Sequence, residues 1–370
     1  MTAEAEPARR YARLRYRLAL IEMAGWLVFL LAYQTLGASR IFADAAARLS
    51  ASAWWQLAAY LTVFGLVSYL VFLPLHLYGD LILEHRFGLS RMSVSAWCVR
   101  EMKSLALGGC FSLALTEGLY ALIRQAPAWW PALAAAAWVL ISIALARIFP
   151  VWLLPIFYKT IPLADATLSQ RLSALCDRAK LSILGVFRVE LGAETRKANA
   201  ALAGFGRTRR VLLSDTLLQQ FTPEEIETVL GHELGHQRYR HIGKMLTLAA
   251  LGAWLAFTLV NVAAAWWLRP LGLFGLADLA GYPMLTAVLS LMSFISLPIT
   301  HGLSRHFERQ ADRFAVSVTA QPAAFAEALR KLGALNLADP APPSWIVWLF
   351  YDHPPIAERI RDALRAASAG

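Results

Sequence analysis

The chain from Thr222 to Leu268 reads TPEEIETVLGHELGHQRYRHIGKMLTLAALGAWLAFTLVNVAAAWWL and combines two opposite characters. Its first part has the signals of a helix start, with Thr222 as N-cap, Pro223 at the first helical position and Glu225 three residues after the cap. Its second part is apolar from Met245 onward and is long enough to cross a bilayer, which needs about 20 such residues. This stretch therefore predicts a polar helix followed directly by a membrane span.

The whole chain of 370 residues has the composition of a membrane protein, with 58% hydrophobic residues, 16% charged residues and a mean hydropathy of +0.49. Six stretches are apolar enough to span a bilayer. They run from Leu18 to Ser39, Ala51 to Gly79, Ser104 to Ile123, Gln125 to Ala146, Met245 to Leu268 and Leu279 to Thr300. The first is too long for a signal peptide and lacks a cleavage site, so we expect it to be retained. The sequence thus predicts a mainly α-helical, multi-pass bundle in the lipid bilayer.

Basic residues are distributed unevenly around these spans. Short loops rich in Lys and Arg favour the cytoplasmic side. Such residues precede the first span and separate the second from the third, at Arg9, Arg10, Arg13, Arg15, Arg17, Arg86, Arg91, Arg100 and Lys103. We therefore expect both termini and the polar segments in the cytoplasm. The high Ala, Leu and Arg content favours a bacterial inner membrane.

Two further observations bear on this topology. The pairs Trp54–Trp55, Trp129–Trp130 and Trp266–Trp267 fall at the predicted outer ends of spans, where indole rings favour the interface; rings that merely fill the bundle are the alternative. The net charge of +10 lies in short runs beside apolar segments, so nucleic acid is not an expected partner.

The polar segments suggest one domain built from two pieces. We predict an N-terminal membrane region at 1–149 with four spans, a first cytoplasmic piece at 150–244, a two-span hairpin at 245–303 and a second cytoplasmic piece at 304–370. Alternating apolar runs predict the short strands of a small β-sheet. These runs are Val186 to Leu191, Asn199 to Gly204 and Arg209 to Leu213.

The polar helix carries an HExxH pattern at His232, Glu233 and His236. Four-residue spacing places both imidazoles on one helix face, one turn apart. Cys98, Cys110 and Cys176 have no paired spacing, so a cysteine-based metal site is not expected. Neutral imidazole suits Zn²⁺, whose catalytic sites have three protein ligands and one open position. Glu233 is the candidate general base, and Gly235 suggests close packing or a nearby substrate.

The third ligand must come from another segment. After the last span the chain reads SRHFERQADRFA from Ser304 to Ala315, and Glu308 and Asp312 lie one turn apart on a predicted helix. Glu308 is the candidate third ligand of one Zn²⁺ per chain. Asp312 is the candidate for orienting a ligating histidine through its other ring nitrogen. Without the HExxH pattern, this run would be interpreted as a solvated charged face.

Taken together, the motifs resemble the M48-type integral-membrane zinc metalloproteases, which include the type I CAAX prenyl proteases (Ste24-like) and the HtpX-like proteases. The resemblance covers nearly the whole chain. Its motifs are KANA at 197–200, RVLLSDTLL at 210–218, GHELGH at 231–236, FERQAD at 307–312, and HPP at 353–355 with Arg359. Four spans before the HExxH, together with EHRFG at 84–88, look more like the CAAX branch. Eukaryotic members of that branch have seven spans and six are counted here, so we expect the missing span to be one at the N-terminus.

The resemblance implies roles for further residues. Glu233 would pass a proton from the attacking water to the leaving amine, and His353 and Arg359 would stabilise the oxyanion. His353–Pro354–Pro355 is expected to start a last helix, with Arg359 in its next-but-one turn. Substrate would pair along an edge strand at Asn199 and Ala200. From the residues alone, Asn199 could equally cap a turn, and Arg359 could pair with a surface carboxylate.

Other polar residues are harder to assign. Glu22 and Glu117 fall within or near apolar spans, and the resemblance implies that they line a water-filled chamber; Glu22 could equally reach the interface. Supporting or surface roles are expected for His76, His241, His301 and His306, and none of them is a predicted ligand.

The expected function is a zinc endopeptidase that acts on peptides or proteins at the membrane, with a prenylated C terminus as one substrate class. An HtpX-like quality-control protease is the alternative within proteolysis. A transporter or receptor with a structural zinc is the alternative outside enzymes. It is weaker, because a closed site needs a fourth protein ligand and no cysteine lies near the motif.

Overall fold

The computed structural model describes residues 5–204 and 208–368. The N-terminal helices are α1 (Ala5–Thr35), α2 (Ala38–Leu49), α3 (Ala53–His76), α4 (Leu83–Arg86), α5 (Val94–Gln125), α6 (Trp130–Ile148) and α7 (Leu154–Phe157). Strands β1 (Thr160–Pro162), β2 (Gly185–Val189), β3 (Ala200–Ala203) and β4 (Arg210–Ser214) follow, with α8 (Ala166–Arg178) between β1 and β2. The remaining helices are α9 (Asp215–Gln220), α10 (Pro223–Arg238), α11 (His241–Leu268), α12 (Tyr282–Thr319), α13 (Pro322–Leu335), α14 (Ser344–Phe350) and α15 (Ile356–Ser368).

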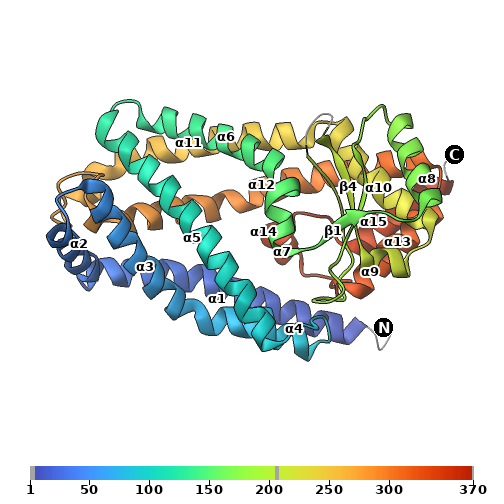
Figure 1. The fold of residues 1–370 in the computed structure, drawn as a ribbon, viewed down its shortest axis with the longest axis horizontal. Coiled ribbons are helices and arrows are strands. Elements are labelled where there is room, and N and C mark those ends of the chain that lie inside the picture. The colour runs from blue at the N-terminus through green and yellow to red at the C-terminus, as the bar shows by residue number, and fades with distance from the viewer. Residues whose placement is uncertain (1–4, 205–207, 369–370) are drawn as a thin grey trace.

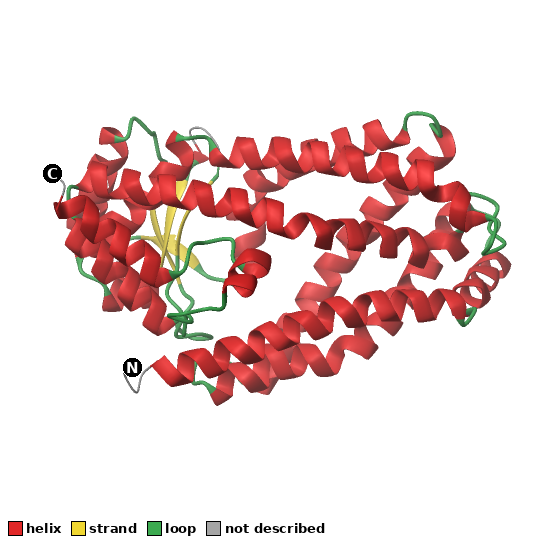
Figure 2. Ribbon diagram, turned by 180° about the vertical axis from the view of Figure 1, so that it is seen from behind, coloured by secondary structure: helices red, strands yellow, loops and turns green. Residues whose placement is uncertain are grey.

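Within these residues, six helices are long and apolar enough to cross a membrane, which confirms the six predicted spans. They cover Glu6–Thr35, Ala53–Arg86, Val94–Gln125, Trp130–Phe157, His241–Leu268 and Leu279–Thr319. Most extend beyond their apolar stretches, because main-chain hydrogen bonding continues a helix whether its side chains are apolar or polar. Helix α12 is the clearest case, since it runs as one rod from the bundle into the compact domain (Figures 1 and 2).

Some tryptophans of the predicted pairs are exposed as interfacial rings, and others fill the bundle. Trp129 and Trp266 are exposed, as interfacial rings should be. Trp130, however, is buried, and its Nε1 donates a hydrogen bond of 2.8 Å to Asn261 on α11. This ring therefore fills the bundle.

The bundle also contains polar side chains. A cavity of about 540 Å³ is lined by Glu22 and His76, among others, and His76 Nε2 lies 3.9 Å from Glu22 Oε1. Glu117 has a buried Oε2 atom without a hydrogen-bond partner among the described residues. The expectation that these carboxylates line a chamber stays a prediction.

The compact domain is built on a four-stranded sheet with the order β1-β2-β4-β3. Strand β2 pairs with β4 in parallel, whereas β1–β2 and β3–β4 are antiparallel. The three predicted strands are confirmed with small shifts, and β1 is an additional strand that the sequence pattern did not indicate. Helices α8, α10, α13 and α15 lie around the sheet, at the end of the molecule opposite α2 (Figure 1).

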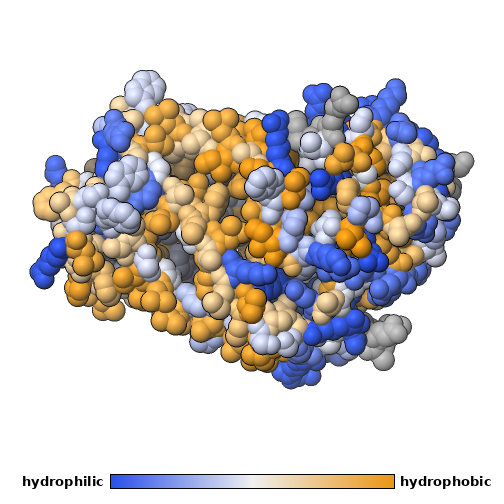
Figure 3. Space-filling model, viewed as in Figure 1, coloured by the Kyte–Doolittle hydropathy of each residue, from blue (hydrophilic) through white to orange (hydrophobic). Residues whose placement is uncertain are grey.

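The two polar pieces of the chain share one hydrophobic core. Leu172, Leu213 and Leu230 from the first piece pack in a cluster with Ala328 from the second. Hydrophilic surface gathers around this domain, whereas apolar side chains cover much of the bundle (Figure 3). The residue boundaries of the four predicted segments stay a prediction.

Two glycines allow α10 to pack closely against α12. A Cβ atom at Gly235 would lie 2.8 Å from the Cα atom of Ala311, and one at Gly231 would lie 3.3 Å from the Cα atom of Ala315. Glycine costs helix stability, on the order of 1 kcal/mol relative to alanine, so its presence here is explained by this backbone contact. Of the two explanations offered for Gly235, the structure supports close packing.

Candidate metal centre and substrate cleft

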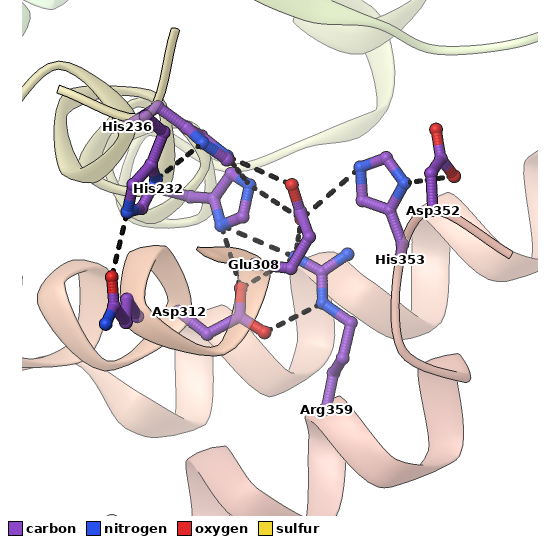
Figure 4. Close-up of polar contacts among 9 residues, drawn as sticks. His232, His236, Glu308, Asp312, Asp352, His353 and Arg359 are labelled. Carbon is purple, nitrogen blue, oxygen red and sulfur yellow. Dashed lines mark hydrogen bonds and ion pairs between the residues drawn. The ribbon is translucent and has the colours of Figure 1, made fainter. Parts of the chain in front are cut away.

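Helix α10 presents the HExxH residues on a firmly capped helix. The Thr222 Oγ1 atom accepts a hydrogen bond from the main-chain N of Glu225 at 3.3 Å, and the Glu225 side chain accepts one from the N of Thr222 at 2.9 Å. Pro223 occupies the first turn. The predicted helix start is therefore confirmed. One turn separates His232 from His236, so both rings lie on the same face, toward α12 (Figure 4).

Three potential ligand atoms converge between α10 and α12. The Nε2 atoms of His232 and His236 lie 3.1 Å apart. Glu308 on α12 places Oε2 at 3.3 Å from the Nε2 of His232 and Oε1 at 3.1 Å from the Nε2 of His236. Within the described parts of the chain, these three residues form the single group that could hold a metal ion.

The donor set fits a zinc ion. Two ligands of a tetrahedral zinc at bond lengths of about 2.0–2.2 Å lie roughly 3.4 Å apart, close to the separations observed here. In addition, Glu308 Oε2 is buried and has no hydrogen-bond partner among the described residues, although buried polar atoms normally have one. A bound cation would satisfy this oxygen.

A second layer of side chains supports His232. Its Nδ1 atom lies 2.8 Å from Asp312 Oδ1, so a ring that ligates through Nε2 donates its other proton to this carboxylate. Arg359 donates two hydrogen bonds to Asp312, from Nε at 2.8 Å and from Nη2 at 2.7 Å. The three side chains therefore hold one another in place.

Charge around His232 is balanced by these contacts. Burial alone lowers the pKa of His232, but the hydrogen bond to Asp312 and the nearby Glu308 carboxylate outweigh burial and raise the pKa to about 9. Burial likewise lowers the pKa of Arg359, and attraction to Asp312 more than offsets that effect. The carboxylates therefore stabilise positive charge on this side of the centre.

His353 approaches the centre from the loop before α15. Its Nε2 lies 3.3 Å from Glu308 Oε2, and its Nδ1 lies 2.7 Å from Asp352 Oδ1, which orients the ring (Figure 4). The side chain is half exposed. One sequence expectation needs correction: α15 begins at Ile356, so Arg359 lies in its first turn and not its next-but-one turn. The role of Arg359 as an oxyanion donor stays a prediction.

A cleft of about 520 Å³ opens beside the centre. It brings together the predicted site residues Asn199, Ala200, His232, Glu233, His353 and Arg359. Asn199 immediately precedes β3, which is one of the two edge strands of the sheet. The cleft therefore combines the HExxH helix, a strand edge and the His353 loop in one concave surface.

Comparison with known proteins relates this arrangement to a family. The family model described as peptidase family M48 matches residues 162–367, which is more than half of the chain. The chain belongs to peptidase family M48. A second model, described as the CAAX prenyl protease N-terminal region with five membrane helices, matches residues 2–159. Among residues 5–159, which the structure describes, this M48 chain has four candidate spans, one fewer than the five membrane helices of that family model.

Individual relatives of this M48 chain are named as proteases. It is 26% identical to the uncharacterized metalloprotease YhfN of Bacillus subtilis, over 85% of this chain and 74% of that protein. It is 25% identical to the CAAX prenyl protease 1 homolog of Homo sapiens, over 83% and 73%. The solved structure of Ste24p from S. mikatae has the same fold, with a TM-score of 0.86 at 24% identity over 98% of this chain and 88% of that one.

These findings make this M48 chain a metalloprotease with a multi-pass membrane region, similar along most of its length to CAAX prenyl proteases. Its substrates are accordingly peptides or proteins at a membrane. Membership of a peptidase family favours the protease over a transporter or receptor.

For His241 the sequence left a supporting role and a surface role open. His241 is 2% exposed, and its Nδ1 lies 3.1 Å from the Nδ1 of His236. Its Nε2 lies 2.9 Å from Gln310 Oε1, and its ring stacks on Phe307. The available signal was a histidine five residues after the HExxH, directly after the left-handed residue Arg240 that precedes α11. His241 therefore orients His236 as Asp312 orients His232.

Replacing His241 by phenylalanine is expected to weaken zinc binding by roughly 10- to 100-fold, the usual effect of losing such a partner. The variant keeps the stacked ring and removes both nitrogens, so that the Nδ1–H group of His236 loses its acceptor. Chelator competition followed by metal analysis measures the affinity. His306→Phe, at an exposed position on α12, is the control and should bind zinc as the wild type does. Unchanged affinity in His241→Phe would contradict the orienting role.

Proposed function

We propose that this chain is a zinc endopeptidase that cleaves membrane-associated peptides at the cleft beside α10. One observation carries the proposal: His232, His236 and Glu308 converge at a cleft that Glu233 and the edge strand β3 also line. A structural zinc would need a fourth protein ligand. The three-residue donor group next to an open cleft supports a catalytic site.

His232, His236 and Glu308 would hold the ion. When bound, zinc supplies Lewis acid chemistry at the substrate carbonyl and lowers the pKa of water. Glu233 takes a proton from the attacking water on its carboxylate and delivers that proton to the nitrogen of the leaving amine. Asp312 holds His232 in the ligating tautomer, and Arg359 fixes the Asp312 carboxylate in place.

The remaining cleft residues would bind and polarise the peptide. An extended peptide pairs its main chain with the strand edge at Asn199 and Ala200, which secures its register with little side-chain selectivity. In its doubly protonated form His353, which donates from Nδ1 to Asp352, also donates from Nε2 toward the oxygen on which negative charge develops. Arg359 adds positive charge beside that position.

The substrate class and its compartment follow from the relatives and the charge pattern. CAAX prenyl proteases are named among the relatives, so we propose substrates with a prenylated C terminus. The arginines before the first span and the basic loop between the second and third spans support a cytoplasmic cleft and cytoplasmic termini in a bacterial inner membrane. Nucleic acid is not a proposed partner, because the positive charge flanks membrane helices.

Hydrolysis of matched peptides tests this proposal. Purified protein is expected to contain one zinc per chain and to cleave a farnesylated peptide in preference to its unmodified twin. A chelator should stop cleavage, and zinc should restore it. Equal cleavage of both peptides would retain the protease and reject the prenyl preference. Zinc-loaded protein that cleaves neither peptide would reject the proposed function.

A further inference from the structure

The EHRFG motif at 84–88 takes no part in the proposed reaction, yet its first residue is buried. The Glu84 side chain is only 12% exposed, and each of its carboxylate oxygens has its own partner. Oε1 accepts a hydrogen bond from the Tyr11 hydroxyl on α1, and Oε2 lies 2.8 Å from the Nζ atom of Lys197. Lys197 Nζ also donates to the Tyr11 hydroxyl at 3.3 Å. Three distant segments therefore meet at one carboxylate.

Main-chain hydrogen bonds join the segment after Glu84 to the segment before Lys197. Arg91 N donates to Glu194 O at 2.8 Å, and Arg196 N donates to Leu89 O at 2.9 Å. The Thr195 hydroxyl also donates to Leu89 O, at 3.0 Å. The segment before Lys197 is thus anchored to the loop that follows Glu84 by both backbone and side chains.

The anchored segment leads directly to the substrate edge. Lys197 is two residues before Asn199, and its main-chain oxygen accepts a hydrogen bond from the Thr216 hydroxyl at 2.8 Å. The main-chain N of Asn199 donates to Ser214 Oγ at 2.9 Å. Strand β3 begins at the next residue, Ala200. Side chains of a strand alternate between its two faces. A shift of the register by one residue at Lys197 would therefore turn the β3 side chains that face the cleft to the opposite face.

The pair of buried Glu84 with Lys197, whose side chain is 37% exposed, is weak evidence for stability, because desolvation of the carboxylate offsets much of the attraction. Such pairs can instead select one conformation among several. This pair lies between the membrane helices and strand β3, which enters the cleft. Its position supports a role in selecting one conformation of that strand.

We propose that Glu84 is a positioning residue for substrate. Through Lys197 it sets the register of strand β3, and so determines which peptide bond reaches the metal centre. This inference rests on the proposed function and adds to it a link from helices α1 and α4 to the substrate strand.

The test uses the full-length protein and a peptide that the wild type cleaves at one bond. Glu84→Gln keeps the shape of the side chain but cannot neutralise the ammonium group, and Lys197→Met removes the charge while keeping the chain length. Each is expected to raise KM by roughly 5- to 30-fold and to produce additional products cut at neighbouring bonds, with zinc content unchanged. The double variant should be no worse than the single ones, because both substitutions remove the same pair.

Arg40→Met is the matched control. It leaves Asp278, whose side chain is 9% exposed, without the cation that lies 3.3 Å away, just as Lys197→Met leaves Glu84. Arg40 lies on α2, and this helix is at the end of the molecule opposite the sheet (Figure 1). This variant is expected to lower thermal stability while keeping the wild-type KM and a single cleavage site.

Tyr11→Phe provides a milder second variant, since it removes one hydroxyl and retains the ion pair. It should raise KM in the same direction, by less than Glu84→Gln does. Wild-type KM and a single cleavage site in both Lys197→Met and Tyr11→Phe would overturn the positioning role, even if Glu84→Gln does not fold. Cleavage that is lost in Glu233→Gln but unaltered in the Glu84 series rejects this inference alone. Absence of wild-type cleavage rejects the proposed function, and this inference with it.

Discussion

Replacing Glu233 by glutamine is expected to abolish peptide cleavage while zinc remains bound. Glu233 lines the cleft next to the two histidines of the candidate centre, but it does not belong to the converging ligand group. The amide keeps the size of the side chain and cannot take a proton from water. General acid–base catalysis contributes about 10²- to 10⁴-fold, so kcat should fall by at least that range, because Glu233 serves in both proton transfers.

The measurement pairs kcat and KM with zinc analysis of the same preparation. Glu224→Gln is the matched control, because Glu224 lies on the same helix and is half exposed, paired with Arg171 at 2.9 Å. It should retain wild-type kcat. A Glu233→Gln protein that still turns over at the wild-type rate would show that another group moves the proton.

Replacing Glu308 by glutamine is expected to remove the metal and, with it, the activity. The variant loses the negative charge that faces His232, His236 and His353, and a neutral amide is a poor zinc ligand compared with a carboxylate. Zinc affinity should therefore fall by more than the roughly 100-fold that follows from losing a supporting partner.

Chelator competition measures this affinity, and circular dichroism checks that the helices remain. Glu358→Gln serves as the control, since Glu358 pairs with Arg309 at 2.9 Å close to the centre but is not part of the converging group. Zinc bound at wild-type affinity by Glu308→Gln would mean that a different residue completes the site. The two variants also separate proton transfer from metal binding, because Glu233→Gln should keep zinc without turnover and Glu308→Gln should lose zinc.

Much of the fold could be predicted because its signals are local. A bilayer imposes a minimum apolar length on each span, so six stretches could be counted from composition alone. Thr222 and Glu225 predicted the start of α10, because a capping box depends on residues three apart. Strand β1, only three residues long at 160–162, carried no such pattern and was missed.

Part of the candidate site was accessible for the same reason. His232 and His236 are four residues apart, and helix geometry alone places them on one face. Glu308 and Asp312 gained their interpretation from the HExxH motif and from resemblance, since nothing in residues 304–315 specifies which helix they face. The contact of the Arg359 guanidinium with Asp312 was not predicted, because it joins two helices that are distant in the sequence.

By itself, the sequence determined the elements whose causes lie within a few residues: the apolar spans, the capped α10 helix, the short strands and the pair of imidazoles on one face. Only the tertiary structure decided that Gly235 lets α12 approach, that His241 supports His236 and that Glu84 holds Lys197. Glu84 and Lys197 are more than a hundred residues apart, and Gly235 and Ala311 more than seventy. The physical reason is that such contacts depend on how whole helices pack, and that packing leaves no periodic trace in either segment.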